Sequence, residues 1–516
     1  MLLCSQKEFC DVNSKLWNEN DSQSKRYFLV EGLLAEIPTH LVRLGIVANA
    51  IRDVTNMTPV VILYSYNEEI QRLFRSFGIS EFVYLDDTKL NLMEKACIVV
   101  KMTPYIFCRK VKYMLSAAYK GVNFGHLVFD GIIHSNETCY TVEKVNRACI
   151  SSFYRCNKFI KKYSKMIARY KTDMVLLTHN EYVEYGALSV TAIANGNIIV
   201  NISDFEFSIS RKKNEIYWHE RLRAGLKKVI SHHSIDELIK EGEKQLEKRL
   251  DGVSGLFDTK YAFINKKEYT REELAERYTH NTKKNIFIFM HVFSDAPHLS
   301  KMTMYSDYYE WIIDTIDKIR NIDNVNWYIK AHPSAFLYGE TNKIREMMKT
   351  SKGNVFWTPD DFNTSSIKNV ADAIITCQGT VGIEASCMGI PVVITGLPYY
   401  SRFGFTIEPK TRQEYYLVLN RMHKIRKLSI EKVKKAQVVM GAYSEYTFSD
   451  NTILDSEVYE YSGYGERTDY EHAYSKIVEN MRDKIKEDIP LYVKGKEILE
   501  EYIRNVDDGL KKTPEV

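Results

Sequence analysis

Short apolar runs alternate with stretches of helical spacing through the first part of the chain. The runs "RYFLVEG" (26–32) and "PVVILYS" (59–65) enclose a segment whose apolar residues recur every three or four positions. Three further runs predict strands: "HLVFDG" (126–131), "TDMVLLTHN" (172–180) and "NIIVN" (197–201). Strands separated by helices favour a parallel sheet, because a parallel connection has to cross the sheet.

A second series of the same kind begins at "KNIFIFMHVFSDAPH" (284–298). It continues through the strands "NWYIKAHPS" (326–334) and "NVFWT" (354–358), and it ends in the strand-turn-helix-strand unit "IITCQGTVGIEASCMGIPVVITG" (374–396). We therefore expect an α/β chain with two Rossmann-like domains. The predicted parts are an N-terminal extension (1–25), the first domain (26–205), a charged helical connection without clear strands (206–283), the second domain (284–410) and a helical tail (411–516) that packs back across the first domain.

The composition agrees with a chain of more than one domain and indicates where in the cell the protein is located. The 516 residues exceed what one hydrophobic core accommodates. The 71 basic and 67 acidic residues give a net charge of +4, which does not indicate a nucleic-acid-binding protein. Nine cysteines without a CxxC pair favour a reducing, cytoplasmic environment. No run reaches the about 18 apolar residues of a spanning helix, so we expect any membrane contact to be peripheral.

A His-Pro pair follows the second strand of the second series. Lys330, His332 and Pro333 stand at the carboxyl end of "WYIKAHPS", and ligands bind at that edge in open parallel sheets. Proline ends strand pairing there, so the histidine is expected to project from the sheet, where an imidazole N–H can donate to a phosphate oxygen. Taken alone, a His-Pro pair is more often a loop cap.

A glycine-rich turn follows the strand "AIIT" on the same edge. Gly379, Thr380, Val381 and Gly382 open the next helix, where free backbone N–H groups can hold an anion. Glu384 on the first turn either favours the helix dipole or accepts the hydroxyls of a ribose. Tight packing explains the glycines equally well. Two neighbouring strand ends that converge on one edge nevertheless indicate a single nucleotide-phosphate site.

These two segments resemble a known family. "KAHPS" followed by "TCQGTVGIEASCMGIPVVITGLPYYSRFGFT" is similar to the capsule polysaccharide biosynthesis glycosyltransferases, which include bacterial Kdo transferases and have sialyltransferase-like relatives. The resemblance implies the GT-B fold, in which two Rossmann-like domains face each other across a cleft. It places His332 and Thr380 near the donor phosphate and Glu384 near the ribose. It also implies a CMP-activated donor and inverting transfer without a metal ion or other cofactor.

The same resemblance implies where the catalytic residues lie. GT-B enzymes usually hold the general base in the first domain, and relatives carry an acidic-Gly motif where this chain has Asp130 after a predicted strand. Phe129 replaces the first acidic residue of that motif, and Asp-Gly is also an ordinary turn. His291 and Asp295 follow the first strand of the second domain and complete the predicted catalytic set.

Three further residues are candidates on the acceptor side. Glu31 and Glu36 follow the first strand, and His179 ends the strand "MVLLTH". Each also suits a role in capping its loop. The segment "HVFSDAPH" (291–298) contains two histidines and an aspartate, but an irregular loop is a poor metal site and no metal is expected.

The preferred function is transfer of a sugar from a nucleotide-activated donor to a bacterial surface or capsular polysaccharide or a glycolipid. The expected partners are the nucleotide-sugar donor and a glycan or lipid-linked glycan acceptor. The basic helical stretches 155–171 and 421–437 are either solvated faces or contacts with an anionic membrane. The alternatives are a CDP-polyol phosphotransferase of the teichoic-acid type, a nucleotide-sugar 2-epimerase and a non-catalytic assembly scaffold.

Overall fold

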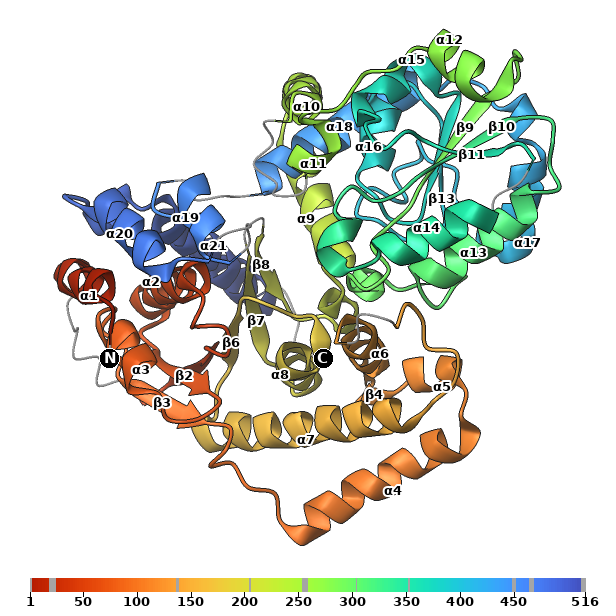
Figure 1. Cartoon of the computed structure of the whole chain (residues 1–516). Coiled ribbons are helices and arrows are strands. Elements are labelled where there is room, and N and C mark those ends of the chain that lie inside the picture. The colour runs from red at the N-terminus through yellow and green to blue at the C-terminus, as the bar shows by residue number, and fades with distance from the viewer. Residues whose placement is uncertain are drawn as a thin grey trace.

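The computed structural model describes residues 2–17, 25–135, 139–203, 206–252, 259–302, 304–350, 353–447, 452–463 and 468–511. The first sheet has the order β3 (Glu81–Tyr84), β2 (Thr58–Leu63), β1 (Tyr27–Glu31), β6 (Met174–Leu177), β7 (Ile198–Ile202) and β8 (Phe207–Ser210). The second sheet has the order β11 (Val355–Trp357), β10 (Asn326–Lys330), β9 (Asn285–Phe289), β12 (Ala373–Thr376) and β13 (Val392–Ile394). Except for β8, the strands of both sheets run parallel (Figure 1). The predicted α/β class with two Rossmann-like domains is confirmed.

Helices surround both sheets. Those of the first part of the chain are α1 (Cys4–Leu16), α2 (Pro38–Thr55), α3 (Glu68–Arg75), α4 (Leu92–Cys108), α5 (Val111–Leu115), α6 (Gly125–His134), α7 (Arg147–Tyr170) and α8 (Tyr182–Ala194), with the hairpin β4 (Ala118–Tyr119) and β5 (Val122–Asn123). Those of the connection and second domain are α9 (Trp218–His232), α10 (Ile235–Leu250), α11 (Thr259–Phe263), α12 (Arg271–Leu274), α13 (Tyr308–Ile319), α14 (Thr341–Thr350), α15 (Ile367–Val370) and α16 (Val381–Cys387). The last are α17 (Arg412–Asn420), α18 (Ile430–Tyr446), α19 (Ser456–Tyr461), α20 (Tyr470–Met481) and α21 (Pro490–Lys511).

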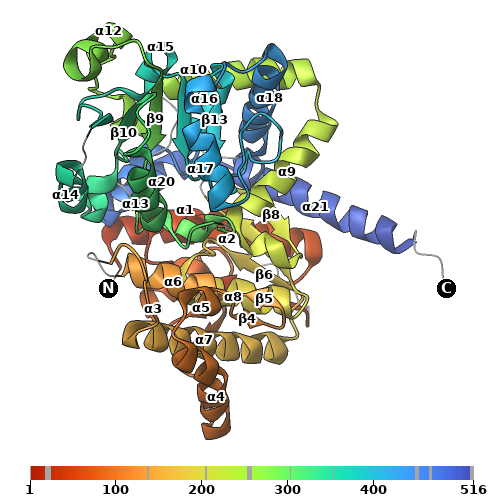
Figure 2. The ribbon, with the colours of Figure 1, turned by 90° about the vertical axis from the view of Figure 1, so that its right-hand side faces the viewer.

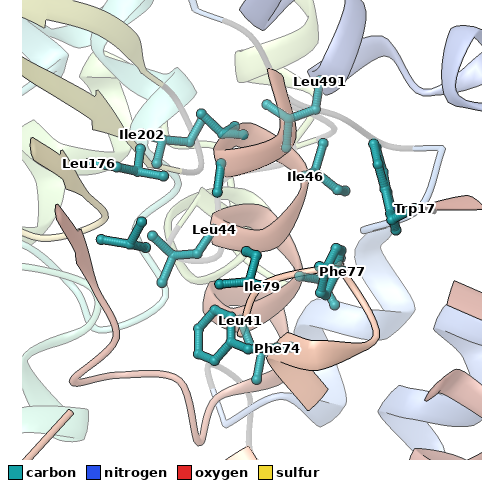
Figure 3. Packing of buried hydrophobic residues seen from close by; sticks show 14 of the residues in the cluster. Trp17, Leu41, Leu44, Ile46, Phe74, Phe77, Ile79, Leu176, Ile202 and Leu491 are labelled. Atoms are coloured by element: carbon teal, nitrogen blue, oxygen red, sulfur yellow. The ribbon is translucent and has the colours of Figure 1, made fainter. Parts of the chain in front are cut away.

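Hydrophobic clusters lie on both faces of each sheet, as expected for parallel sheets covered by helices. The cluster that Figure 3 shows joins distant parts of the chain. Trp17 at the end of α1, Ile46 on α2 and Leu491 on α21 all belong to it. The first domain therefore completes its core with the last helices of the chain.

The helices beyond residue 411 divide between the two domains. Helix α17 contributes to a core cluster of the second domain, and α18 packs against α10 and α16. Helices α20 and α21 contact α1 and α2 of the first domain, and Figure 2 shows α21 extending away from it. Glycines permit the close crossing of α10 and α18, since a Cβ at Gly242 would lie 2.1 Å from the carbonyl oxygen of Gln437.

Two element predictions are wrong. The run 126–131 lies in the helix α6 rather than in a strand, and the predicted strand-free connection begins with β8 (207–210). Helix α6 packs between α7 and α8, with Leu127, Val128 and Phe129 all buried. A continuous apolar run suits a buried helix as well as a buried strand, so its hydrophobicity could not distinguish the two.

Candidate donor and acceptor sites

A cavity of about 130 Å³ lies at the carboxyl ends of β10 and β12, on either side of β9, where the strand order of the second sheet reverses. Ligands bind at this position in open parallel sheets. The loop after β10 and the turn before α16 both line it, so the two predicted donor-binding segments come together. We call it the donor cavity after this prediction, and the predicted residues that line it are His291, Lys330, His332, Pro333, Gly379, Thr380, Val381 and Glu384.

Lys330 is the most unusual side chain of the donor cavity. It is only 7% exposed, and none of the described acidic residues forms an ion pair with it. Burial lowers the pKa of its ammonium group to about 8, and the positive charge of Lys266 contributes. A buried ammonium without a partner is costly. An anionic ligand in the cavity would remove that cost.

The turn before α16 presents free donors to the same cavity. Thr380 precedes the helix, and the backbone N–H groups of Thr380 and Val381 have no hydrogen-bond acceptor among the described residues. A hydrogen bond holds the turn in place, because the hydroxyl of Tyr400 donates to the carbonyl oxygen of Gly379 over 2.5 Å. A phosphate oxygen could accept from these N–H groups.

Packing, rather than a ligand, requires the next two glycines. Gly382 does not line the donor cavity, and a Cβ there would lie 2.1 Å from the hydroxyl oxygen of Tyr400. Gly389 has φ +81°, which suits its place just after the end of α16. Gly379 lines the cavity, so of the three it alone fits the predicted approach of the backbone to a ligand.

Glu384 forms a buried ion pair with Arg249 at the end of α10. The Arg249 Nε donates to Glu384 Oε1 over 2.6 Å, and both side chains are buried. Burial lowers the pKa of Arg249, but the Glu384 carboxylate, together with Tyr399 and Tyr443, raises the pKa above its usual value. Both residues line the donor cavity. The predicted ribose contact of Glu384 therefore has to coexist with this pair, which the sequence did not reveal because the two residues lie far apart in the chain.

His291 holds the turn rather than standing free as a base. The N–H of Gln378 donates to His291 Nε2 over 2.9 Å, so Nε2 carries no proton and the neutral ring carries its proton on Nδ1. Burial lowers the pKa of His291, and the nearby His332 contributes. The ring stacks on Tyr308 with 4.1 Å between centroids. The predicted role in proton abstraction is thus unsuited to Nε2, whereas the Nδ1–H group can act as a donor.

Gln378 also connects the turn to the loop after β9, a role that no sequence pattern indicates. Its side-chain Oε1 accepts from the Ser300 hydroxyl over 2.7 Å, and its Nε2 donates to the carbonyl of Pro297 over 3.0 Å. The loop that carries His291 and Asp295 is therefore fixed to the donor cavity at two points.

Asp130 lies in a helix and its carboxylate contacts the second domain. The Nδ1 of His298 lies 2.5 Å from Asp130 Oδ1, and the backbone N–H of His298 donates to Asp130 Oδ2 over 3.2 Å. Both side chains are buried. The sequence placed Asp130 at a strand end facing an acceptor, and this placement is wrong. Its carboxylate instead links α6 to the loop after β9.

We expect Asp130→Ala to lower the free energy of unfolding by about 2–3 kcal/mol, because two buried N–H donors of His298 lose their acceptor. Urea unfolding followed by tryptophan fluorescence would measure the loss. Asp130→Asn, which retains one oxygen, is the matched control and should lose less. Equal unfolding curves for Asp130→Ala and the unsubstituted protein would contradict the assigned contact.

A second cavity, of about 250 Å³, lies between the domains. Its residues from the first part of the chain include His179, Asn180 and Asn201, and Asp295 contributes from the loop after β9. Asp295 is exposed, and His179 Nδ1 lies 3.1 Å from a carboxylate oxygen of Glu181. The structure thus brings two predicted residues, His179 and Asp295, into one interdomain cavity.

The other two acceptor-side candidates lie elsewhere. Glu31 is completely buried and accepts hydrogen bonds from the Leu33 N–H over 2.7 Å and the Thr178 hydroxyl over 3.0 Å. Burial raises the pKa of Glu31 to about 7. Glu36 is exposed in the loop before α2. Neither residue lines the donor cavity or the interdomain cavity, so the predicted acceptor set is divided.

Residues 248–448 match the model of a protein family described as capsule polysaccharide biosynthesis protein. The matched segment contains the whole second sheet and both loops of the donor cavity. The resemblance found in the sequence is confirmed, because this part of the chain is similar to the capsule polysaccharide biosynthesis family. No curated protein matches the chain.

Solved structures of low similarity were also found. The β-Kdo 2,4-transferase KpsC of Thermosulfurimonas dismutans is 15% identical, with 52% of this chain and 79% of that chain covered and a TM-score of 0.32. The UDP-GlcNAc 2-epimerase of Neisseria meningitidis is 10% identical, with 81% and 98% covered and a TM-score of 0.22. The spinosyn rhamnosyltransferase SpnG is 10% identical, with 82% and 96% covered and a TM-score of 0.26.

Proposed function

We propose that the protein is a GT-B glycosyltransferase that moves a sugar from a nucleotide-activated donor, with a CMP-sugar favoured, to a bacterial surface polysaccharide or lipid-linked glycan. The observation that carries this proposal is the donor cavity, where the buried Lys330 lies with Thr380 and Val381, whose N–H groups have no acceptor among the described residues. The similarity of residues 248–448 to the capsule polysaccharide biosynthesis family supports the substrate class.

The donor cavity suits the departure of a nucleotide. As the bond between the sugar and the phosphate breaks, negative charge develops on the phosphate oxygen. The ammonium of Lys330, the His291 Nδ1–H and the N–H groups of the turn would stabilise that charge without reorganising. Fixed donors of this kind make a metal ion unnecessary, so we propose transfer without a metal or other cofactor.

The interdomain cavity would receive the acceptor. Its hydroxyl oxygen would attack the anomeric carbon from the face opposite the phosphate, which inverts the configuration. Asp295 is exposed in this cavity and is our choice for the group that takes the hydroxyl proton. Asp130 would act indirectly, by holding His298 and the loop that carries Asp295. We place the reaction in the cytoplasm, at the inner face of the cell membrane where lipid-linked acceptors are held.

A thermal-shift panel tests the nucleotide. We expect CMP to raise the melting temperature by a few degrees at about 100 times its Kd, with smaller shifts for CDP, UDP and GDP, because a ligand of the native state stabilises it. Cytidine is the matched control, since it lacks the phosphate and should shift the melting temperature least. If none of the four nucleotides produced a shift, the proposed donor would be contradicted.

A further inference from the structure

Helix α4 projects from the first domain on the side away from the second domain, and both views of the chain show this position (Figures 1 and 2). It packs against α7 and α5. Only Ile98 and Met102 are buried among its residues. Most of the surface of this helix therefore faces outward.

The outward surface of α4 is apolar, which is unusual for a surface helix. Met93, Val100 and Phe107 are 78%, 69% and 82% exposed. They recur every seven residues and so lie along one line of the helix, opposite Ile98 and Met102. Six uncharged residues are exposed between and beside them: Leu92, Ala96, Cys97, Val99, Thr103 and Pro104. We call this surface the outer face of α4.

Positive charge surrounds the outer face. Five basic residues between 92 and 112 are exposed: Lys95, Lys101, Arg109, Lys110 and Lys112. Glu94 is the sole acidic residue of that segment, and its carboxylate is paired with Lys165 of α7 over 2.7 Å. Among the described residues, these five basic side chains form no ion pair. An apolar stripe with such a basic border is complementary to an anionic lipid surface, where acyl chains lie beneath negative headgroups.

The alternative occupants fit this pattern less well. A second copy of α4 packed on the outer face would bring two basic borders together, and like charges repel. The basic stretch 155–171 is a weaker candidate for lipid contact, because two of its basic side chains already have partners within the protein. Arg155 pairs with Glu184, and Lys162 donates to the carbonyl of Leu85. Among the described residues, no helix is long and apolar enough to cross a bilayer.

We propose that α4 is an interfacial anchor that inserts its outer face into the headgroup region of an anionic bilayer. Its basic residues would contact lipid phosphates while Met93, Val100 and Phe107 reach the acyl boundary. The proposed membrane binding depends on the surface of α4 alone. The purpose that we assign to this binding, which is to bring the acceptor side of the enzyme to a lipid-linked glycan, rests on the proposed function.

Vesicle co-sedimentation tests the anchor. We expect the protein to bind vesicles of phosphatidylglycerol mixed with phosphatidylcholine and to bind pure phosphatidylcholine vesicles far less. The double variant Val100→Glu/Phe107→Glu should lose about tenfold or more of this binding, because two carboxylates would enter the apolar layer and oppose the negative surface. Both positions are exposed, so the melting temperature and the response to CMP should be retained.

The matched control is Ile430→Glu on α18, which is 78% exposed and lies in the other basic stretch, 421–437. This variant should bind vesicles as the unsubstituted protein does. The proposal is overturned if the unsubstituted protein ignores anionic vesicles or if the double variant binds them equally well. It is also overturned if sedimentation velocity shows a dimer that the double variant dissociates, since the outer face would then join two copies of the chain.

Discussion

Replacing Glu384 by glutamine is expected to lower the free energy of unfolding of the second domain by about 3–5 kcal/mol. The guanidinium of Arg249 lies beside this carboxylate in a buried position, and glutamine would leave its charge uncompensated. The same change would disturb the donor cavity, because both residues line it. Equilibrium unfolding in urea, followed by tryptophan fluorescence, measures the stability loss.

Two controls separate the ion pair from a general effect of substitution. The double variant Arg249→Met/Glu384→Met should be more stable than Glu384→Gln alone, since a buried pair can be replaced by apolar side chains at little cost. Glu431→Gln breaks an exposed pair with Lys435 on α18 and should leave the unfolding curve close to the original. A loss below about 1 kcal/mol for Glu384→Gln would show that the pair is not buried as described.

The second large effect is expected for Lys330→Met, which should change stability and binding in opposite directions. Removing a buried charge that has no acidic partner in the part of the chain that the structure describes should leave the protein equally stable or more stable. The affinity for the donor nucleotide should fall by about tenfold or more, because a charged hydrogen bond to phosphate is lost. Calorimetric titration and thermal unfolding of the same variant would measure both.

The lowered pKa of Lys330 also predicts how the stability of the protein and its nucleotide affinity change with pH. The pKa of Lys330 is lowered in the folded protein from 10.5 to about 8. Between these values the unfolded chain binds more protons, so this residue makes folding more favourable as pH rises through that window. Phosphate binding requires the ammonium form, so nucleotide affinity should fall as pH rises above about 8.

Lys330→Met should abolish the part of the pH dependence that lies above about pH 8. The matched control is Lys266→Met, which removes the neighbouring positive charge and should retain nucleotide binding while moving the affinity midpoint to higher pH. An unchanged nucleotide affinity in Lys330→Met would mean that the ammonium does not contact the phosphate.

Much of the donor cavity was predictable from the sequence because parallel strands place their carboxyl ends on one edge. The His-Pro loop and the glycine-rich turn each follow a clear apolar strand, so their convergence followed from the strand pattern alone. The ion-pair partner of Glu384 was not predictable, since Arg249 lies on α10, which is far away in the sequence. Nor could the sequence show that His291 Nε2 accepts a hydrogen bond from the backbone N–H of Gln378.

The first domain was less predictable for a different reason. The run around Asp130 is apolar throughout, and such a run is compatible with a strand or a buried helix. Helix α4 presents the reverse problem, because its apolar residues would suggest a buried face, yet the structure exposes Val100 and Phe107. Which apolar surface is covered depends on the tertiary arrangement of α4 and α7, and local spacing does not contain that information.

A crystal structure of the protein with the nucleotide that raises its melting temperature most would show where the phosphate binds. We expect the phosphate to lie in the donor cavity, within hydrogen-bond distance of Lys330 Nζ and of the N–H groups of Thr380 and Val381. A phosphate bound in the interdomain cavity beside His179 and Asp295, with the donor cavity unoccupied, would contradict this expectation.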